Sequence, residues 1–163
     1  MCGDVTSEPW GSENGYSAVR CSACGLVYLD PWPDITEREK ALAYGEHPGE
    51  KLLKTTTRYR PSAVQEYRRI LGEIYGLNYF EDRELNWLDI GCGYGEFLET
   101  LSQLAAPGSK LRGSEPNLTK KASAQKRGLD VDFYDLQELD EEYSHISLLN
   151  VFSHLTDPVG FLN

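Results

Sequence analysis

The sequence lacks an apolar run long enough to cross a membrane, and residues 1–20 contain no signal-peptide core. It also lacks an excess of positive charge, because 16 Lys and Arg residues are outnumbered by 26 Asp and Glu residues, for a formal net charge of −10. Nucleic acid and anionic lipid would repel such a chain, so we expect neither as a partner. Cysteine is scarce too: four residues, one inside a glycine motif, do not suggest a disulfide framework. A reduced, cytoplasmic setting is therefore expected.

The length and composition indicate an ordinary globular chain. Its 163 residues can bury about one core, and the 40% hydrophobic and 26% charged residues are globular values. The stretch 87–100, WLDIGCGYGEFLET, organises the prediction, because an apolar strand end is followed by alternating glycines and then by a helix-period apolar face. A strand, a tight glycine turn and a helix in that order predict a nucleotide-binding α/β unit.

The residues around the glycines indicate the kind of ligand. Gly91, Gly93 and Gly95 suit a turn that forbids a β-carbon and a backbone that a ligand approaches closely. A dinucleotide-binding turn, G-x-G-x-x-G, would place glycine at position 96, where this chain has Glu96. A carboxylate there opposes a phosphate and suits a cation. With Asp89 ahead of the first glycine, this pattern disfavours an NAD-dependent oxidoreductase.

A second acid follows the next predicted strand, residues 110–114. Glu115 lies 20 residues after Gly95, where Rossmann-type folds place an acid that binds ribose hydroxyls. One carboxylate can accept hydrogen bonds from both the 2′- and the 3′-hydroxyl. The alternative is a surface acid on a loop, which the spacing of the two acids around the glycine turn makes the weaker interpretation.

These motifs resemble those of the class I S-adenosylmethionine-dependent methyltransferases. The resemblance rests on acid-x-Gly-x-Gly-x-Gly at 89–95, Gly-x-acid-x at 113–116, an acid after the strand 131–134, and residues 150–158, NVFSHLTDP. It implies a Rossmann-like α/β fold with a parallel sheet, of which the strand order 3-2-1-4 is present and the remaining strands are missing. We therefore expect a truncated methyltransferase whose fourth strand, 146–152, leaves an open apolar edge through which the chain can self-associate.

The resemblance also implies roles for individual residues. It implies that the methionine part of the cofactor is bound by Asp89, Gly91, Cys92, Gly93 and Gly95. It implies further that Glu115 and Pro116 bind the ribose and that Asp135 and Leu136 bind the adenine. Asn150 is expected beside the methyl group. His154 is a candidate general base for an oxygen or sugar-carbon acceptor, and a structural histidine is the alternative. The acceptor is expected to be a small molecule.

The N-terminal cysteines suggest a metal site. Cys21-x-x-Cys24-Gly25 has the form of a zinc knuckle, and Cys2-Gly3 looks like the end of a second one. We expect Cys2, Cys21 and Cys24 as zinc ligands, with a fourth from His47, an acid or another chain. An idle or redox-active cysteine pair is the alternative. The following segment, 26–33, is similar to segments of bacterial methyltransferases, several of which act on nucleotide-linked sugars.

Three parts of the chain are predicted. Residues 1–34 form an irregular, partial zinc-ribbon-like segment, 35–60 a linker with a short helix at 35–43, and 61–163 the S-adenosylmethionine-binding domain. Within that domain we predict helices at 61–76, 96–104 and 118–127, the first with an apolar face of Val64, Tyr67, Leu71 and Ile74. Tyr59 and Arg60, just before it, are expected to reach the cofactor's carboxylate. A non-catalytic protein, either a zinc-dependent interaction module or a cofactor-binding remnant, is the alternative function.

Overall fold

The computed structural model describes residues 2–47, 49–54, 57–134, 136, 138–155 and 157–162. The chain divides into two compact units, which we call unit 1, ending at Thr56, and unit 2, Thr57–Leu162. Within the described residues, no helix has both the length and the apolar character that crossing a bilayer requires.

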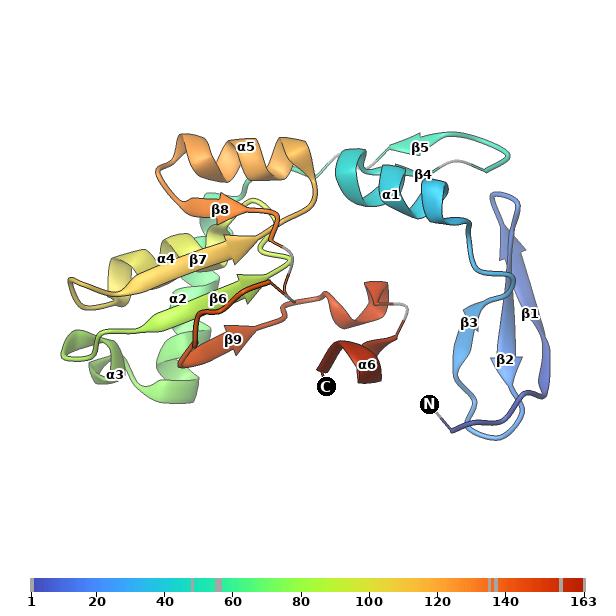
Figure 1. Cartoon of the computed structure of the whole chain (residues 1–163), viewed down its shortest axis with the longest axis horizontal. Helices are drawn as coiled ribbons and strands as arrows, with labels where there is room; N and C mark the ends of the chain where they lie inside the picture. The colour runs from blue at the N-terminus through green and yellow to red at the C-terminus, as the bar shows by residue number, and fades with distance from the viewer. Residues whose placement is uncertain are drawn as a thin grey trace. The chain divides into compact units, whose positions relative to one another are not determined.

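Unit 2 is built on a parallel sheet of four strands (Figure 1). The strands are β6 (Asn86–Ile90), β7 (Lys110–Ser114), β8 (Asp130–Asp132) and β9 (His145–Ser147). Their order is β8-β7-β6-β9, and each neighbouring pair is parallel. The Rossmann-like α/β fold and the strand order 3-2-1-4 are thereby confirmed.

The helices of unit 2 are α2 (Pro61–Tyr75), α3 (Asn78–Glu81), α4 (Glu96–Leu104), α5 (Leu118–Lys126) and α6 (Pro158–Leu162), with a 3₁₀ helix at Phe152–His154. Figure 1 shows α2 and α4 behind the sheet, and the two helices pack against each other. Proline in the first turn of α2 and a glycine after its last turn set its limits as predicted.

The core lies between the sheet and α2, α3 and α4. Its most buried side chains include Phe80, Leu85, Trp87, Leu98 and Leu101. The predicted apolar face of α2 is wrong at one position, because Ile74 is 66% exposed. In this last turn the Tyr75 ring, which is 40% exposed, contacts the edge of the core, with its centroid 5.9 Å from that of Phe80 and 6.2 Å from that of Trp87.

The strand predicted at 146–152 is shorter than expected. Only three residues, His145–Ser147, pair with β6, and the backbone then turns at Asn150, which has a φ of 57°. An apolar run does not by itself distinguish a strand buried on both faces from a short edge strand. Ile146 is accordingly 55% exposed. The strand predicted at 131–134 also lies slightly earlier in the chain, at Asp130–Asp132.

Unit 1 contains more regular structure than the sequence led us to expect. An antiparallel sheet joins β1 (Ser7–Glu13), β2 (Tyr16–Cys21) and β3 (Val27–Leu29), and α1 (Ile35–Tyr44) is followed by the short pair β4 (Glu46–His47) and β5 (Leu53–Lys54). The first hairpin turns at Asn14 and Gly15, whose φ angles of 52° and 82° are those of a type I′ turn. This Asn-Gly pair is the signal that the prediction of an irregular segment overlooked.

Candidate cofactor site

The glycine loop between β6 and α4 forms the centre of the site. Gly91, Gly93 and Gly95 all have positive φ angles, of 69°, 60° and 82°. The backbone N–H groups of Gly91 and Cys92 donate to the carbonyl oxygen of Ser114, at 2.7 and 3.1 Å, so the loop is tied to the end of β7. This edge, at the carboxyl ends of parallel strands, is where open α/β sheets bind ligands.

The three glycines are required for different reasons. A β-carbon at Gly91 would overlap Val151, and one at Gly95 would lie 2.7 Å from Leu129 Cδ1 and 3.2 Å from the β-carbon of Ala124. A β-carbon at Gly93 would meet nothing within 4 Å among the described residues. Gly91 and Gly95 therefore allow close packing, whereas Gly93 leaves bare backbone facing open space.

Glu115 links the glycine loop to the end of β7. The residue is only 5% exposed. One carboxylate oxygen accepts the N–H of Gly93 at 2.8 Å, and the other accepts the N–H of Asn117, also at 2.8 Å. Each carboxylate oxygen can accept a further hydrogen bond, so Glu115 can bind two hydroxyl groups without releasing the loop. Glu115 thus lies directly after β7, as predicted, and its contact with the glycine loop is one that the sequence did not predict.

Asp89 is the most buried acid of this site, at 1% exposure. Its Oδ1 accepts the hydroxyl of Ser147 at 2.6 Å, and the Ser147 oxygen accepts the indole N–H of Trp87 at 3.0 Å. Burial raises the pKa of Asp89 to about 7, the Ser147 hydrogen bond opposes this rise, and the nearby charge of Glu115 adds to it. Asp89 therefore titrates near neutral pH.

The comparison with known proteins agrees with this geometry. Residues 56–163, well over half of the chain, match the family described as Methyltransferase domain. The chain belongs to this methyltransferase family. Ubiquinone biosynthesis O-methyltransferase of Parvibaculum lavamentivorans is 30% identical over 116 residues, which are 64% of this chain and 45% of that protein. This methyltransferase chain thus spans less than half the length of that curated relative.

Solved methyltransferase structures resemble the chain more distantly. Magnesium protoporphyrin IX methyltransferase from Synechocystis PCC 6803, with bound S-adenosylmethionine, is 21% identical with a TM-score of 0.43, over 58% of this chain and 46% of that one. A methyltransferase from Aquifex aeolicus is 20% identical with a TM-score of 0.46, over 64% of each chain. The Rossmann-like fold of unit 2 is shown by its own parallel strand order, β8-β7-β6-β9.

The other predicted residues of the methyltransferase site lie in several environments. Cys92 is buried, burial raises the pKa of its thiol, and its sulfur occupies the space next to Gly113, so its side chain belongs to the core. Asp135 lies outside the described residues. Among the remaining predicted residues, Pro116 and Leu136 are half-buried. Asn150 and His154 are exposed, and His154 lies in the 3₁₀ helix that follows β9.

The segment before α2 is fastened to α4. The Tyr59 hydroxyl donates to Glu99 at 3.0 Å, and the Arg60 N–H donates to a carboxylate oxygen of Glu96, also at 3.0 Å. The guanidinium of Arg127 lies 3.9 Å from the Tyr59 ring centroid and pairs with Glu99. These partners are 28 to 40 positions apart in the sequence, so no local pattern reveals them. We expected Glu96 to suit a cationic ligand and Tyr59 to reach the cofactor's carboxylate. In the structure, both side chains connect the segment before α2 to α4.

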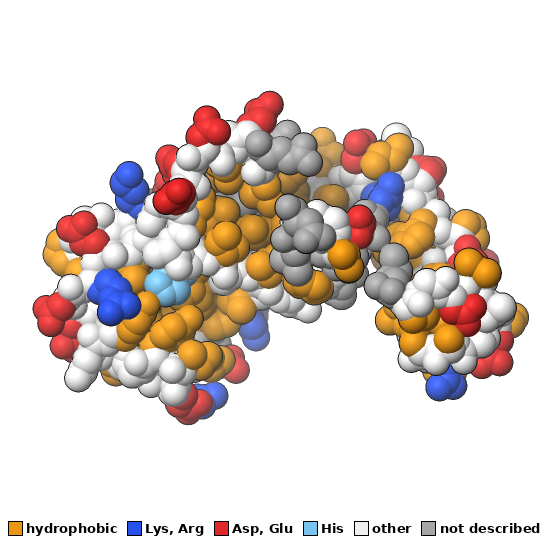
Figure 2. Space-filling model, turned by 60° about the horizontal axis from the view of Figure 1, so that its bottom comes forward, with side chains coloured by type: hydrophobic (Ala, Val, Ile, Leu, Met, Phe, Trp, Pro, Cys, Tyr) orange, Lys and Arg blue, Asp and Glu red, His pale blue; other side chains and the backbone are white. Residues whose placement is uncertain are grey.

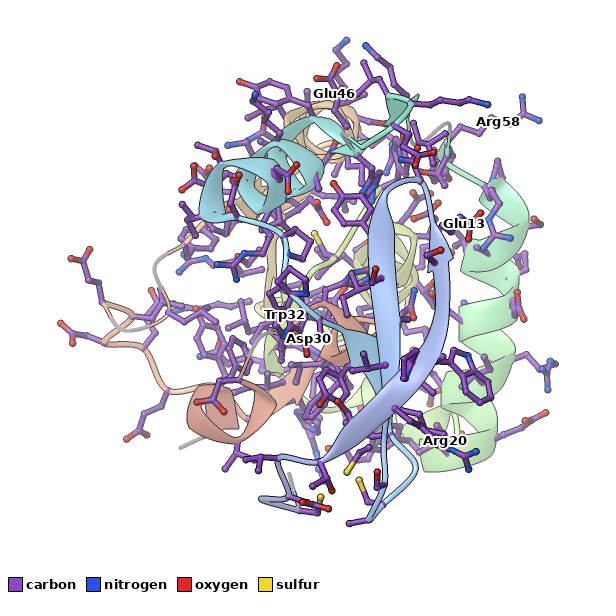
Figure 3. The ribbon with its side chains drawn as sticks, turned by 90° about the vertical axis from the view of Figure 1, so that its right-hand side faces the viewer. Glu13, Arg20, Asp30, Trp32, Glu46 and Arg58 are labelled. Carbon is purple, nitrogen blue, oxygen red and sulfur yellow. The ribbon has the colours of Figure 1, made fainter. Side chains whose placement is uncertain are left out.

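Unit 1 brings the three predicted metal ligands together. The sulfur atoms of Cys2, Cys21 and Cys24 all lie within 4.8 Å of one another, and those of Cys2 and Cys21 are 3.6 Å apart. Two thiolates on one tetrahedral zinc ion stand roughly 3.8 Å apart, given a Zn–S distance of about 2.3 Å. Backbone N–H groups of Cys24 and Ala23 lower the pKa of Cys21. His47 is not a member of this cluster, in the part of the chain that the structure describes. Figure 3 shows sulfur atoms at the end of the hairpin near Arg20.

Proposed function

We propose that unit 2 binds S-adenosylmethionine and that the protein to which it belongs transfers the methyl group to a small molecule. The observation that carries this proposal is the contact between Glu115 and the N–H of Gly93. It places a carboxylate suited to ribose hydroxyls directly beside the one loop glycine that faces open space. Family membership and the name of the curated relative support the same reaction class.

Each residue takes the role in this proposal that the resemblance to the methyltransferase motifs implies. Asp89 and the glycine backbone orient the methionine part, and Glu115 with Pro116 holds the ribose. Asp135 and Leu136 bind the adenine, and Asn150 lies beside the methyl group. When bound, the cofactor supplies an electrophilic sulfonium methyl group. The protein then contributes chiefly by holding an acceptor in line with that group, an arrangement that is worth effective molarities of roughly 10⁵–10⁸ M in favourable cases.

For the methyl acceptor we propose a chemical class and not an individual compound. An oxygen acceptor needs a base, and His154 is the candidate because it is exposed after the carboxyl end of β9. The name of the curated relative gives that protein an oxygen acceptor, which favours a small-molecule hydroxyl here. A nucleotide-linked sugar is the second acceptor class, suggested by the resemblance of residues 26–33.

Titration calorimetry with S-adenosylmethionine tests the cofactor proposal. We expect the wild-type chain to bind S-adenosylmethionine and S-adenosylhomocysteine and not NAD. Glu115→Ala should lose about 1–3 kcal/mol of binding free energy, the value of hydrogen bonds to a charged group. Glu66→Gln, a change of an exposed acid in α2, is the matched control and should bind normally. Folded wild-type protein that binds neither ligand would contradict the proposal and favour a non-catalytic interaction module or remnant.

We propose further that the thiol cluster of unit 1 binds zinc. The three converging sulfur atoms and the N–H groups that favour a Cys21 thiolate support this. The four cysteines are free thiols, which suits the reducing cytoplasmic setting that we also propose. Elemental analysis should find one zinc ion per chain in wild-type protein and in Cys92→Ala, and less in Cys24→Ser. Equal zinc contents in wild type and Cys24→Ser would refute the site.

A further inference from the structure

Unit 1 contains a groove that the methyltransferase site does not use. Its volume is about 660 Å³, within the range of roughly 300–1,000 Å³ that small-molecule sites occupy. The β1–β2 hairpin, α1 and the β4–β5 pair all contribute to its lining, which is mostly apolar: Trp10, Tyr16, Ala18, Leu29, Ala41 and Leu53. A groove of this size and character can hold a small organic molecule.

Arg38, from α1, lines the groove, and its Nε lacks a hydrogen-bond partner among the residues that the structure describes. Its Nε is buried and makes no hydrogen bond with any described residue, and no ion pair of Arg38 is found among them. An arginine side chain stays charged at all relevant pH values and carries five N–H donors. A buried donor without an acceptor destabilises the fold unless a ligand supplies the acceptor.

Glu13 and Glu37 also line the groove, and neither forms an ion pair with Arg38 in the described part of the chain. Burial raises the pKa of Tyr16, and the nearby carboxylates of Glu37 and Asp34 add to this rise. Glu13 is exposed at the tip of the β1–β2 hairpin, as Figure 3 shows, with Arg20 toward the hairpin's opposite end. No ion pair among the described residues therefore competes with a ligand for the Arg38 guanidinium.

Trp10 provides an aromatic wall for the same groove. The pairing of β1 with β2 shifts register between Pro9 and Gly11, so Trp10 sits in a β-bulge. Bulges commonly redirect a side chain. The indole is 60% exposed despite its size, and the guanidinium carbon of Arg20 lies 5.5 Å from its ring centroid. A flat apolar body can pack against this indole while its charged end reaches the groove arginine.

We propose that this groove binds a small organic anion with a flat apolar body. The carboxylate or phosphate of the ligand pairs with Arg38, and its ring packs against Trp10. The bidentate geometry of a guanidinium matches both kinds of oxyanion. This site is separate from the proposed cofactor site, since all of its lining residues belong to unit 1.

Binding of matched naphthalene probes to the full chain tests the proposal. The probes are 2-naphthoate, 2-naphthyl phosphate and the neutral 2-naphthalenemethanol, measured by titration calorimetry in the presence of saturating S-adenosylhomocysteine. We expect at least one anionic probe to bind, and the neutral probe to bind about tenfold or more weakly, because a charge-assisted hydrogen bond is lost. The stronger of the two anions identifies the oxyanion as a carboxylate or a phosphate.

Three variants locate the binding site. Arg38→Gln should weaken the anionic probes about tenfold or more, a loss typical of a charge-assisted hydrogen bond. Lys40→Gln removes the same charge from an exposed position of α1 and should bind normally. Trp10→Leu should weaken all three probes. Because the Arg38 Nε makes no hydrogen bond with a described residue, Arg38→Gln should not lower the unfolding midpoint, and this separates lost binding from lost folding.

Several outcomes would overturn the proposal. One is that neither anion binds up to millimolar concentration. Another is that both bind Arg38→Gln as well as wild type. A third is that amide resonances in a ¹H–¹⁵N spectrum shift around Gly91–Gly95 and not around α1 and the hairpin. Failure of S-adenosylhomocysteine to bind would contradict the cofactor proposal alone, since the naphthalene probes report on unit 1.

Discussion

At the scale of single residues, Asp89 links the cofactor site to pH. Its pKa is raised from 3.8 to about 7 mainly by burial. Between these two values the folded chain keeps a proton that the unfolded chain releases, so the folded state loses stability as pH rises. A shift of this size corresponds to about 4 kcal/mol at most, lost between about pH 4 and pH 7 and constant above.

Asp89→Asn should remove this loss, because an amide does not titrate in that range. We expect the free energy of unfolding of the variant, relative to wild type, to rise steadily from pH 4 to pH 7 in urea titrations. Other groups cancel in this difference, including His145, whose pKa is lowered by burial and which acts in the opposite direction. A difference that is independent of pH would show that Asp89 is ionised throughout the range.

Ser147 connects two buried polar groups and should be sensitive to substitution. Ser147→Ala leaves the indole N–H of Trp87 and the carboxyl of Asp89 without their shared partner. We expect a loss of about 1–3 kcal/mol in unfolding free energy, the cost of unsatisfied buried groups. The pKa of Asp89 should also rise further, since this hydroxyl lowers it. Ser102→Ala, at an exposed position of α4, is the control and should change stability by less than about 0.5 kcal/mol.

At the scale of elements, different glycines of the loop between β6 and α4 contribute to stability and to ligand binding. Gly93→Ala should cost only the strain of a left-handed backbone, roughly 1–2 kcal/mol, because its β-carbon meets nothing within 4 Å of the described residues. Gly95→Ala adds an overlap with Leu129 and Ala124, which should cost about 1–3 kcal/mol more. The order should reverse for the affinity toward S-adenosylhomocysteine. Relative to the stability that each variant loses, Gly93→Ala should lose more binding affinity than Gly95→Ala. Urea titration and calorimetry on both variants measure the two orders, and equal effects would contradict separate roles.

The same elements show what the sequence could predict. The limits of α4 and β7 were predictable because a glycine turn and a Pro-Gly break bound them and their apolar periods are clear. The Asn14-Gly15 pair is a signal for a hairpin turn, but we predicted an irregular segment there. The length of β9 could not be predicted from the sequence, because an apolar run has the same pattern in a central strand and in an edge strand. The partners of Tyr59 and Glu115 depend on backbone geometry between distant positions, which no local pattern encodes.

At the scale of the whole molecule, β9 leaves one side of the sheet of unit 2 open. β9 pairs with β6 alone, in the part of the chain that the structure describes. Figure 2, which turns the bottom of Figure 1 toward the viewer, shows hydrophobic side chains gathered on this face. Large exposed apolar residues lie on and after the strand: Ile146, Leu149, Phe152 and Val159. An edge of this kind is a template for pairing with another chain.

We therefore predict that the chain self-associates through β9. Ile146→Lys should shift the protein toward monomer in sedimentation velocity across a concentration series, because a charge on an edge strand opposes strand pairing. The variant should remain folded, since Ile146 is 55% exposed and contributes little to the core. Ile74→Lys, in the last turn of α2 where Ile74 is 66% exposed, is the matched control and should leave association unchanged. If both variants sediment as wild type does, the edge is not the contact. If both become monomeric, general surface hydrophobicity and not strand pairing drives association.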